Sequence, residues 1–330
     1  MGSTGSTAPT PTPSWIDGLL EATVVGSFTK IGPIIRSRSE HWAPIEATPG
    51  RVVVVTGATS GLGREAAIEL GALGCEVVCV GRNQQRLEEV GHEVVAAGGV
   101  AHLEQADLSD LEQTRALGER LLASLDHLDV LVHNAGALLA NRSVTPQGHE
   151  LTVTVHVLSP FLLTSMLRPI LDAADHAKVI MMTSGGMYTE PFDLSTLEMD
   201  AASYKGSVAY ARAKRAQVVL VDALQRREPT DGRTFAAVHP GWAKTPGVAD
   251  SLPTFNKVLG PLLRSPREGV DTLVWLATRP PGQPIGGKLW LDRQPRSPFK
   301  LGRTRVDADT LRQQGDALLA WIEAQTGASV

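Results

Sequence analysis

The stretch that decides the fold is RVVVVTGATSGLGREAAIEL, residues 51–70. Its first six residues are mostly β-branched and predict a short strand that is buried on both faces. Glycines follow at three positions, and the residues after them have the apolar spacing of a helix. The first glycine permits a tight turn, the second lets the backbone approach a phosphate, and the third allows close helix–strand packing. The free N–H groups of the helix then face a pyrophosphate. We therefore expect a dinucleotide to contact Gly57, Thr59, Ser60, Gly61, Leu62 and Gly63.

The rest of the chain alternates between strand-like apolar runs and helical patterns. Strands that alternate with helices form a parallel sheet with both faces covered. The predicted fold class is therefore α/β, a single doubly wound, Rossmann-type domain with a parallel sheet of about seven strands. The further strands are expected at 76–80, 100–107, 129–133, 178–184, 233–240 and 286–292, and the helices at about 62–73, 84–97, 110–125, 147–172 and around Tyr210.

The composition excludes several classes of protein. The 330 residues carry 31 basic and 35 acidic side chains, a net charge of −4, so we expect no nucleic-acid partner. No run approaches the ~20 apolar residues of a transmembrane helix, and the first residues do not resemble a signal peptide. The two cysteines, Cys75 and Cys79, provide neither a disulfide framework nor a zinc site. We expect a cytoplasmic protein without a metal.

Both ends of the chain lie outside the alternating pattern. Residues 1–13 are rich in Ser, Thr, Pro and Gly, and we expect them to be disordered. Residues 14–49 have helical apolar spacing, which fits a helix packed on the main domain or one that contacts a membrane surface or a partner. We expect the main domain to span 50–306, and a C-terminal helix, 307–330, to pack on it.

The end of the second strand indicates which dinucleotide binds. A site for NAD has an acidic residue here, which binds the ribose hydroxyls, but this chain reads Val80-Gly81-Arg82-Asn83. Arg82, with Asn83 beside it, can face a 2′-phosphate, because arginine pairs with phosphate through two parallel hydrogen bonds. Arg64 either adds a second positive charge or is a solvated helix residue. The sequence therefore predicts NADP(H) rather than NAD(H).

Five further motifs follow the glycine loop in order. They are Asp107-Leu108, HNAG at 133–136, Ser184, YARAK at 210–214 and HPGW at 239–242. Over residues 50–295 the chain thus resembles the short-chain dehydrogenases/reductases, and its TGxxxGxG spacing is that of their ordinary, non-extended branch. Segments such as SFTK, TSGGM and LDRQP are similar to the subgroup typified by dehydrogenase/reductase SDR family member 12.

The resemblance implies a role for each matching residue. Tyr210 would be the proton donor or acceptor, Lys214 its partner, and Ser184 the group that holds the substrate oxygen. A free tyrosine has a pKa of ~10, which a nearby ammonium and a positive nicotinamide ring would lower. The other matches would surround the cofactor, as would Tyr210 and Lys214 themselves: Asp107 and Leu108 at the adenine, Asn134, Ala135 and Gly136 along the pocket, and Pro240, Gly241, Trp242 and Thr245 towards the nicotinamide.

One position departs from the family pattern. Members usually carry an asparagine in the fourth helix, where it helps to hold a water that links the catalytic lysine to solvent. The aligned residue here is His156. Histidine can keep a water-mediated relay, because it donates and accepts hydrogen bonds, or it can fill the space and impair proton supply. Pro160 is expected to shift the local backbone, since proline has no N–H.

These observations predict an oxidoreductase that transfers a hydride between NADP(H) and a carbonyl or alcohol substrate. Apolar residues in two segments that could roof the site, 185–199 and 243–265, favour a lipophilic small molecule. The alternative is an NADP(H)-binding protein with weak or no catalysis, a scaffold or redox sensor, which His156 would explain. Apolar residues at 208–224 allow a homo-oligomer of the kind that this family often forms.

Overall fold

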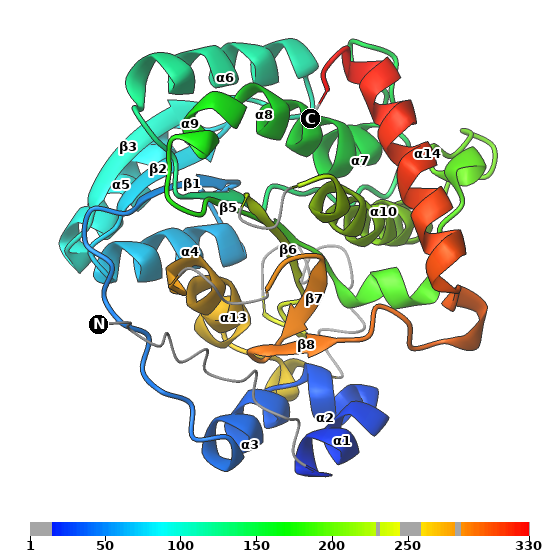
Figure 1. The fold of residues 1–330 in the computed structure, drawn as a ribbon, viewed down its shortest axis with the longest axis horizontal. Coiled ribbons are helices and arrows are strands. Elements are labelled where there is room, and N and C mark those ends of the chain that lie inside the picture. Colours follow the sequence, from blue (N-terminus) through cyan, green and yellow to red (C-terminus); the bar gives the residue numbers. More distant parts are fainter. Residues whose placement is uncertain (1–14, 229–231, 245–258, 281–284, 330) are drawn as a thin grey trace, which may run out of the picture.

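A computed structural model of the chain describes residues 15–228, 232–244, 259–280 and 285–329. Within these residues one sheet of eight strands forms the centre of the molecule, in the order β3-β2-β1-β4-β5-β6-β7-β8 (Figure 1). The expected doubly wound parallel sheet is confirmed, with one strand more than predicted. The strands are β1 (Val52–Thr56), β2 (Glu76–Gly81), β3 (Val100–Gln105), β4 (Val130–His133), β5 (Lys178–Met182), β6 (Thr234–Val238), β7 (Lys288–Leu291) and β8 (Gln294–Arg296).

The additional strand, β8, is antiparallel and follows β7 through a two-residue hairpin. Leu291 pairs with Gln294, and the residues between them, Asp292 and Arg293, have φ angles of 53° and 56°. Two successive left-handed residues make the tight turn that joins hairpin strands. This turn usually contains glycine or asparagine, and β8 has only three residues, so the sequence carried little signal for it. The Asp271 carboxylate, 2.7 Å from Arg293 Nη2, holds one of the two turn residues in place.

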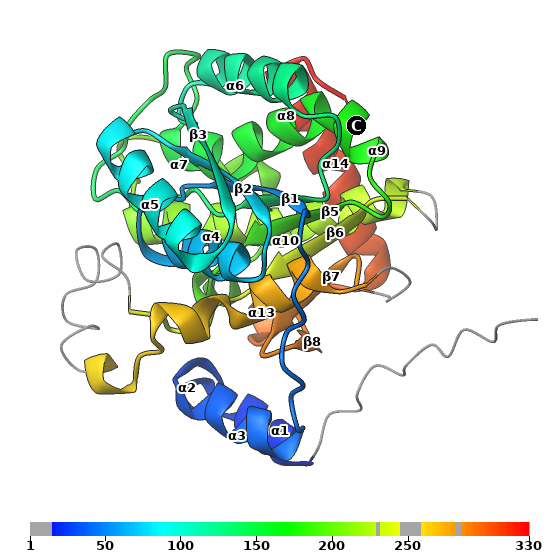
Figure 2. The same ribbon diagram turned by 90° about the vertical axis from the view of Figure 1, so that its left-hand side faces the viewer.

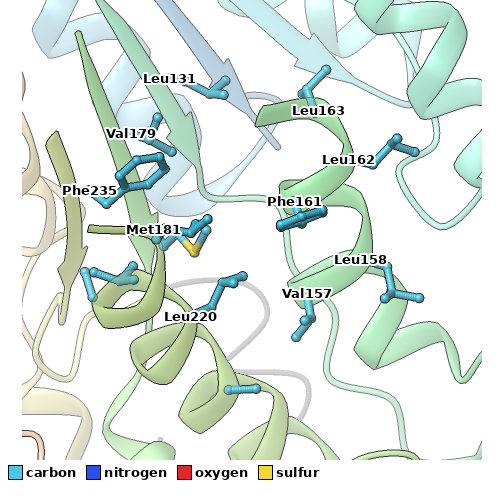
Figure 3. Packing of buried hydrophobic residues seen from close by; sticks show 14 of the residues in the cluster. Leu131, Val157, Leu158, Phe161, Leu162, Leu163, Val179, Met181, Leu220 and Phe235 are labelled. Atoms are coloured by element: carbon cyan, nitrogen blue, oxygen red, sulfur yellow. The ribbon is translucent and has the colours of Figure 1, made fainter. Parts of the chain in front are cut away.

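Helices cover both faces of the sheet and build a separate apolar core on each face (Figures 1 and 2). Successive residues of a strand point to opposite faces, so Val179 and Met181 join one core and Ile180 joins the other. Figure 3 shows the first core, where Phe161 lies across from the sheet residue Met181. One layer consists of α6 (Leu111–Ser124), α8 (Ser159–Met166) and α10 (Gly206–Arg227), and the other of α4 (Gly61–Ala72), α5 (Gln84–Ala97) and α13 (Pro266–Thr278).

The fourth helix is not the continuous one expected at 147–172. It is divided into α7 (Leu151–Val153), a π-helical turn η1 (Thr154–Leu158), α8 and α9 (Arg168–Asp172). Pro160 has no N–H to donate to the carbonyl of His156, four residues earlier. The side chain of Gln217 on α10 donates to that carbonyl instead, at 2.9 Å. The expected effect of Pro160 on the backbone is thus visible in the break, and the freed carbonyl joins the helix to α10.

The last helix, α14 (Ala308–Thr326), packs against α10. Leu318, Leu319 and Ile322 point inward and are fully buried. Part of the apolar surface of α10 that would allow a homo-oligomer is therefore covered within the chain itself. Shorter 3₁₀ turns complete the described structure: η2 (Gly185–Thr189), η3 (Leu194–Thr196), η4 (Gly260–Leu262) and η5 (Gly302–Thr304).

The N-terminal segment forms three helices, α1 (Trp15–Ala22), α2 (Val24–Phe28) and α3 (Ile31–Ser39), which lie below the β7–β8 hairpin (Figure 2). Their inner side is packed on the main domain, with Leu20 and Phe28 buried. Their outer side leaves Trp15 and Leu19 exposed, so a contact between this face and a membrane stays a prediction. Every helix in the described part of the chain is too short or too polar to span a bilayer. The tail at 1–13 lies outside the described residues.

Candidate active site

The carboxyl ends of the parallel strands border a cleft of about 820 Å³. Ligands bind at this edge in open α/β sheets. Most of the predicted site residues line the cleft: Gly57, Thr59, Ser60, Gly61, Leu62, Arg82, Asp107, Leu108, Asn134, Ala135, Gly136, His156, Ser184, Tyr210, Lys214, Pro240, Gly241 and Trp242. Gly63, Arg64 and Asn83 do not line it, and Thr245 lies outside the described residues.

The glycine loop connects β1 to α4 and has the geometry of a phosphate cradle. Gly57 has a φ of 67°, and a Cβ added to it would lie 2.8 Å from the Cα of Ala135. A Cβ on Gly63 would lie 2.3 Å from Nδ2 of Asn134. Within the described residues the Ser60 side chain does not cap the start of α4. The first N–H groups of this helix are thus available to an anion, and the loop fits the pyrophosphate of a dinucleotide.

A threonine that the sequence did not single out joins the glycine loop to the next strand. Thr56 Oγ1 accepts hydrogen bonds from the backbone N–H groups of Asn134, at 3.0 Å, and Ala135, at 3.1 Å. Its own hydroxyl donates to the carbonyl of Val132 at 3.1 Å. Thr56 therefore holds the ends of β1 and β4 together beneath the cleft. The sequence feature that could have indicated this role is a hydroxyl side chain at the end of an otherwise apolar strand.

Of the three residues predicted to face a 2′-phosphate, Arg82 alone reaches the cleft. Its side chain is 75% exposed, and Nη1 lies 3.7 Å from Oδ2 of Asp107. Arg64 points to α5 instead, where its guanidinium forms an ion pair with Glu93. Asn83 caps the start of α5, since its side chain accepts a hydrogen bond from the N–H of Arg86 at 2.9 Å. The electrostatic case for a 2′-phosphate therefore depends on Arg82.

Ser184, Tyr210 and Lys214 meet where β5 ends against α10. Ser184 starts the η2 turn just after the strand, and its hydroxyl lies close enough to Tyr210 to lower the pKa of the phenol. Lys214 lies one helical turn after Tyr210, and its ammonium is 5.6 Å from the centre of the tyrosine ring. Lys214 Nζ also donates to the carbonyl of Met182 at 2.7 Å. The four-residue spacing of the YARAK motif thus brings phenol and ammonium to one side of the helix.

Burial has the largest effect on the pKa values of Tyr210 and Lys214. Burial raises the pKa of Tyr210, and the Ser184 hydroxyl opposes the rise. It also lowers the pKa of Lys214, to about 7. The pKa of Tyr210 is thus raised, whereas the motif predicted that it would be lowered. In the chain by itself, the loss of solvation outweighs the effect of the neighbouring side chains.

His156 lies directly behind Tyr210. The two rings meet edge to face with their centres 5.3 Å apart. Its Nε2 atom is 3.0 Å from the carbonyl oxygen of Ala137, while its Nδ1 atom is buried without a partner among the described residues. Burial lowers the pKa of His156 well below its ordinary value, the charge of Lys214 lowers it further, and the contact with Ala137 opposes both. His156 is therefore a neutral imidazole at the end of the predicted relay.

The cleft is also lined by apolar residues that the sequence did not single out. They are Leu138, Leu139, Leu151 and Val155. They follow β4 or belong to the broken fourth helix, so their exposure to the cleft depends on how these segments bend. Of the two segments expected to roof the site, 185–199 contributes Gly185, Gly186 and Thr189. The other segment, 243–265, contributes Ala243. Its residues 245–258 lie outside the described part of the chain.

Comparisons with known proteins agree with this architecture. A family model described as short chain dehydrogenase matches residues 51–254. Human dehydrogenase/reductase SDR family member 12 is 35% identical, over 76% of this chain and 78% of its own. Mouse polyprenol dehydrogenase is 32% identical over 88% and 92%, and human retinol dehydrogenase 12 is 32% identical over 74% and 78%.

A solved structure of a short chain dehydrogenase from Shigella flexneri complexed with NADP has a TM-score of 0.61, with 22% identity, covering 74% of this chain and 98% of that one. This likeness supports the fold. The family consists of oxidoreductases that use nicotinamide cofactors, and the resemblance to it and to the member 12 subgroup is confirmed. The chain therefore belongs to the short-chain dehydrogenase/reductase family.

Proposed function

We propose that this protein transfers a hydride between NADP(H) and a carbonyl or alcohol substrate, with Tyr210 as the general acid and base. The observation that carries the proposal is the convergence of Ser184, Tyr210 and Lys214 in the same cleft as the glycine loop. A carbonyl reductase needs a dinucleotide and a proton donor that share one site. The preference for NADP(H) is supported by Arg82 and by the lack of a carboxylate in the Gly81–Asn83 segment.

The chain's own residues would supply the proton and hold the substrate oxygen. When bound, the reduced nicotinamide supplies the hydride to the carbonyl carbon. Tyr210 donates its hydroxyl proton to the carbonyl oxygen, which the Ser184 hydroxyl holds in place. Because burial raises the pKa of Tyr210, the phenol is protonated at neutral pH and ready to donate. Lys214, whose pKa of about 7 leaves it partly protonated at neutral pH, stabilises in its protonated form the phenolate that remains. In alcohol oxidation the same groups act in reverse order.

The substrate we propose is lipophilic. The side chains of Leu138, Leu139, Leu151 and Val155 line the cleft, and apolar lining of this kind favours apolar ligands. Two of the relatives are named for lipophilic alcohols, retinol and polyprenol. We therefore expect long-chain or cyclic apolar aldehydes, ketones and alcohols to be turned over in preference to small polar ones.

A panel of carbonyls and alcohols with NADPH and NADP⁺ tests the proposal directly. We expect the Tyr210→Phe variant to lose about 10²–10⁴-fold in turnover, the usual contribution of a positioned general acid. Tyr204→Phe is the matched control, because Tyr204 hydrogen-bonds to Thr152 and does not line the cleft. Turnover that survives Tyr210→Phe at the level of the control would refute the mechanism.

The second candidate is an NADP(H)-binding protein with little catalysis. The observation that favours it is the position of His156, whose ring occupies the family's asparagine position and contacts the Ala137 backbone. Tight NADPH binding with no turnover on the whole panel would support this candidate. A gain of turnover in His156→Asn would show that the histidine limits proton supply, whereas a loss would show that it acts in the relay.

A further inference from the structure

Phe28, the last residue of α2, lies against two loops of the active site. Its side chain is 2% exposed. The centre of its ring is 4.4 Å from that of His239 and 5.7 Å from that of Trp242. Tyr188, in the turn that Ser184 starts, is stacked on the ring with a separation of 5.9 Å. One aromatic residue from the N-terminal segment thus contacts both the 239–242 loop and the turn after β5.

The backbone of the N-terminal segment also holds the 239–242 loop. The carbonyl of Phe28 accepts a hydrogen bond from the N–H of Trp242 at 2.7 Å. The same carbonyl accepts a second one from Arg264 Nε at 3.0 Å. Arg264 lies directly under the turn, because a Cβ added to Gly241 would be 2.1 Å from its Nε atom. The turn therefore rests on a surface made by Phe28 and a buried arginine.

A buried ion-pair network connects this surface to the sheet. The Arg264 guanidinium donates to Ser27 O at 2.7 Å and to Asp292 Oδ1 at 2.5 Å. Arg36 of α3 also pairs with Asp292, and its Nε donates to Asp17 of α1 at 2.6 Å. Each of these four charged side chains is nearly inaccessible to solvent. Such pairs hold their groups in one arrangement, since a displaced charge would remain buried and unpaired.

His239 connects Phe28 to the turn that borders the cleft. Its Nδ1 atom accepts a hydrogen bond from the N–H of Gly241 at 2.7 Å, which shapes the turn. On the opposite side, a Cβ added to Gly185 would lie 2.9 Å from Nε2 of His239 and 3.4 Å from the Phe28 ring. The imidazole thus packs against both Phe28 and the residue that follows Ser184. A shift of Phe28 would move the ring that shapes the Pro240–Trp242 turn.

We propose that Phe28 is a positioning residue for the nicotinamide side of the cleft, acting through His239 and Trp242. The N-terminal segment is then part of the active site and not only a cover on the main domain. The inference rests on the proposed function for the place of the nicotinamide, because Pro240, Gly241 and Trp242 line the cleft beside Ser184. The adenine end would lie at Arg82, which lines the cleft together with Val80 and Gly81 at the end of β2.

Two ligands distinguish positioning from a general loss of structure. NADPH would occupy both ends of the cleft, whereas adenosine 2′,5′-bisphosphate carries the adenine half only. We expect Phe28→Ala to weaken NADPH binding about tenfold, a loss equal to 1.4 kcal/mol, and to leave the affinity for adenosine 2′,5′-bisphosphate unchanged. We also expect kcat to fall by up to about 10²-fold, the cost of a small misplacement of reacting groups. Calorimetric titration measures both affinities.

The matched control is Leu19→Ala, which shortens an exposed side chain of the same segment and should leave both affinities as in the wild type. Phe28→Leu keeps an apolar side chain behind His239 and should restore most of the NADPH affinity. If Phe28→Ala does not fold, Phe28→Val takes its place, with a smaller loss of the same kind expected.

Equal weakening of the two ligands, or no change in either, would overturn the inference. This comparison does not depend on turnover. If the wild type reduces no carbonyl, the proposed reaction is refuted. A selective loss of NADPH affinity in Phe28→Ala would still support the positioning role.

Discussion

The preference for NADP(H) can be tested at one side chain, Arg82. The substitution Arg82→Ala removes the one predicted 2′-phosphate ligand that lines the cleft. A charge-assisted hydrogen bond contributes about 1.5–3 kcal/mol when it is protected from water. Arg82 is 75% exposed and also faces Asp107 at 3.7 Å, and solvent and a competing carboxylate both reduce this contribution. We therefore take about 1.4 kcal/mol, which corresponds to a tenfold change in Kd.

We expect the Kd of NADPH to rise about tenfold in Arg82→Ala, while the Kd of NADH, which has no 2′-phosphate, stays within error of the wild type. Titration by fluorescence or calorimetry at low and at physiological salt measures both. The difference between wild type and variant should shrink as salt is added, because the pair is exposed. Arg86→Ala is the matched control, since it removes an exposed positive charge that lies outside the cleft. An equal loss for both cofactors, or an unchanged ratio, would refute the reasoning.

Two further predictions concern stability. Asp292→Asn should lower the free energy of unfolding by about 3–5 kcal/mol, because Arg264 would remain buried without its carboxylate and Arg36 would keep only its partners on α1. Urea unfolding measures this loss, with the exposed Asp309→Asn as a control, and a loss no larger than the control's would contradict the prediction. Burial lowers the pKa of His133 to about 3, below its value of ~6.5 in the unfolded chain. Between pH 3 and pH 6.5 the unfolded chain binds a proton at His133 and the folded chain does not. His133 should therefore lower the free energy of unfolding by about 1.4 kcal/mol for each unit that pH falls below 6.5. Unfolding curves at pH 7.5, 6 and 5 should thus show a shallower pH dependence in His133→Gln, and identical slopes would show that His133 contributes nothing.

Much of the fold could be predicted because its signals are local. The β-branched run before Gly57 and the glycine spacing after it mark a strand, a turn and a helix within twenty residues. Most of the other parallel strands are short apolar runs, with the edge strand β3 the exception, and each strand appears within a few residues of its predicted position. The candidate acid–base pair was equally visible, because Tyr210 and Lys214 are one helical turn apart and share a helix side whatever surrounds them.

Features that depend on a neighbour from another element were not predictable. Pro160 predicted a local change in the fourth helix, but not that Gln217 of α10 would bind the carbonyl of His156 that Pro160 leaves free. Arg64 has the charge for a phosphate but turns to Glu93 on α5. The pKa of Tyr210 is raised because the fold buries it, and no spacing of residues along a chain reports how much water is excluded.

The sequence alone determined the chain's class, its family resemblance and the order of its motifs, because periodicity and spacing act over one strand, loop or helix at a time. The tertiary structure decided which residues stand behind those motifs. Arg36 and Asp292 are 256 positions apart and share one buried ion pair, and Phe28 meets His239 across a similar distance in sequence. Such contacts form when a sheet with its covering helices brings remote segments together and burial then requires each charge to find a partner. The site that carries the motifs and the packing of the N-terminal segment on the main domain could therefore be foreseen, whereas the contact of Phe28 with His239 could not.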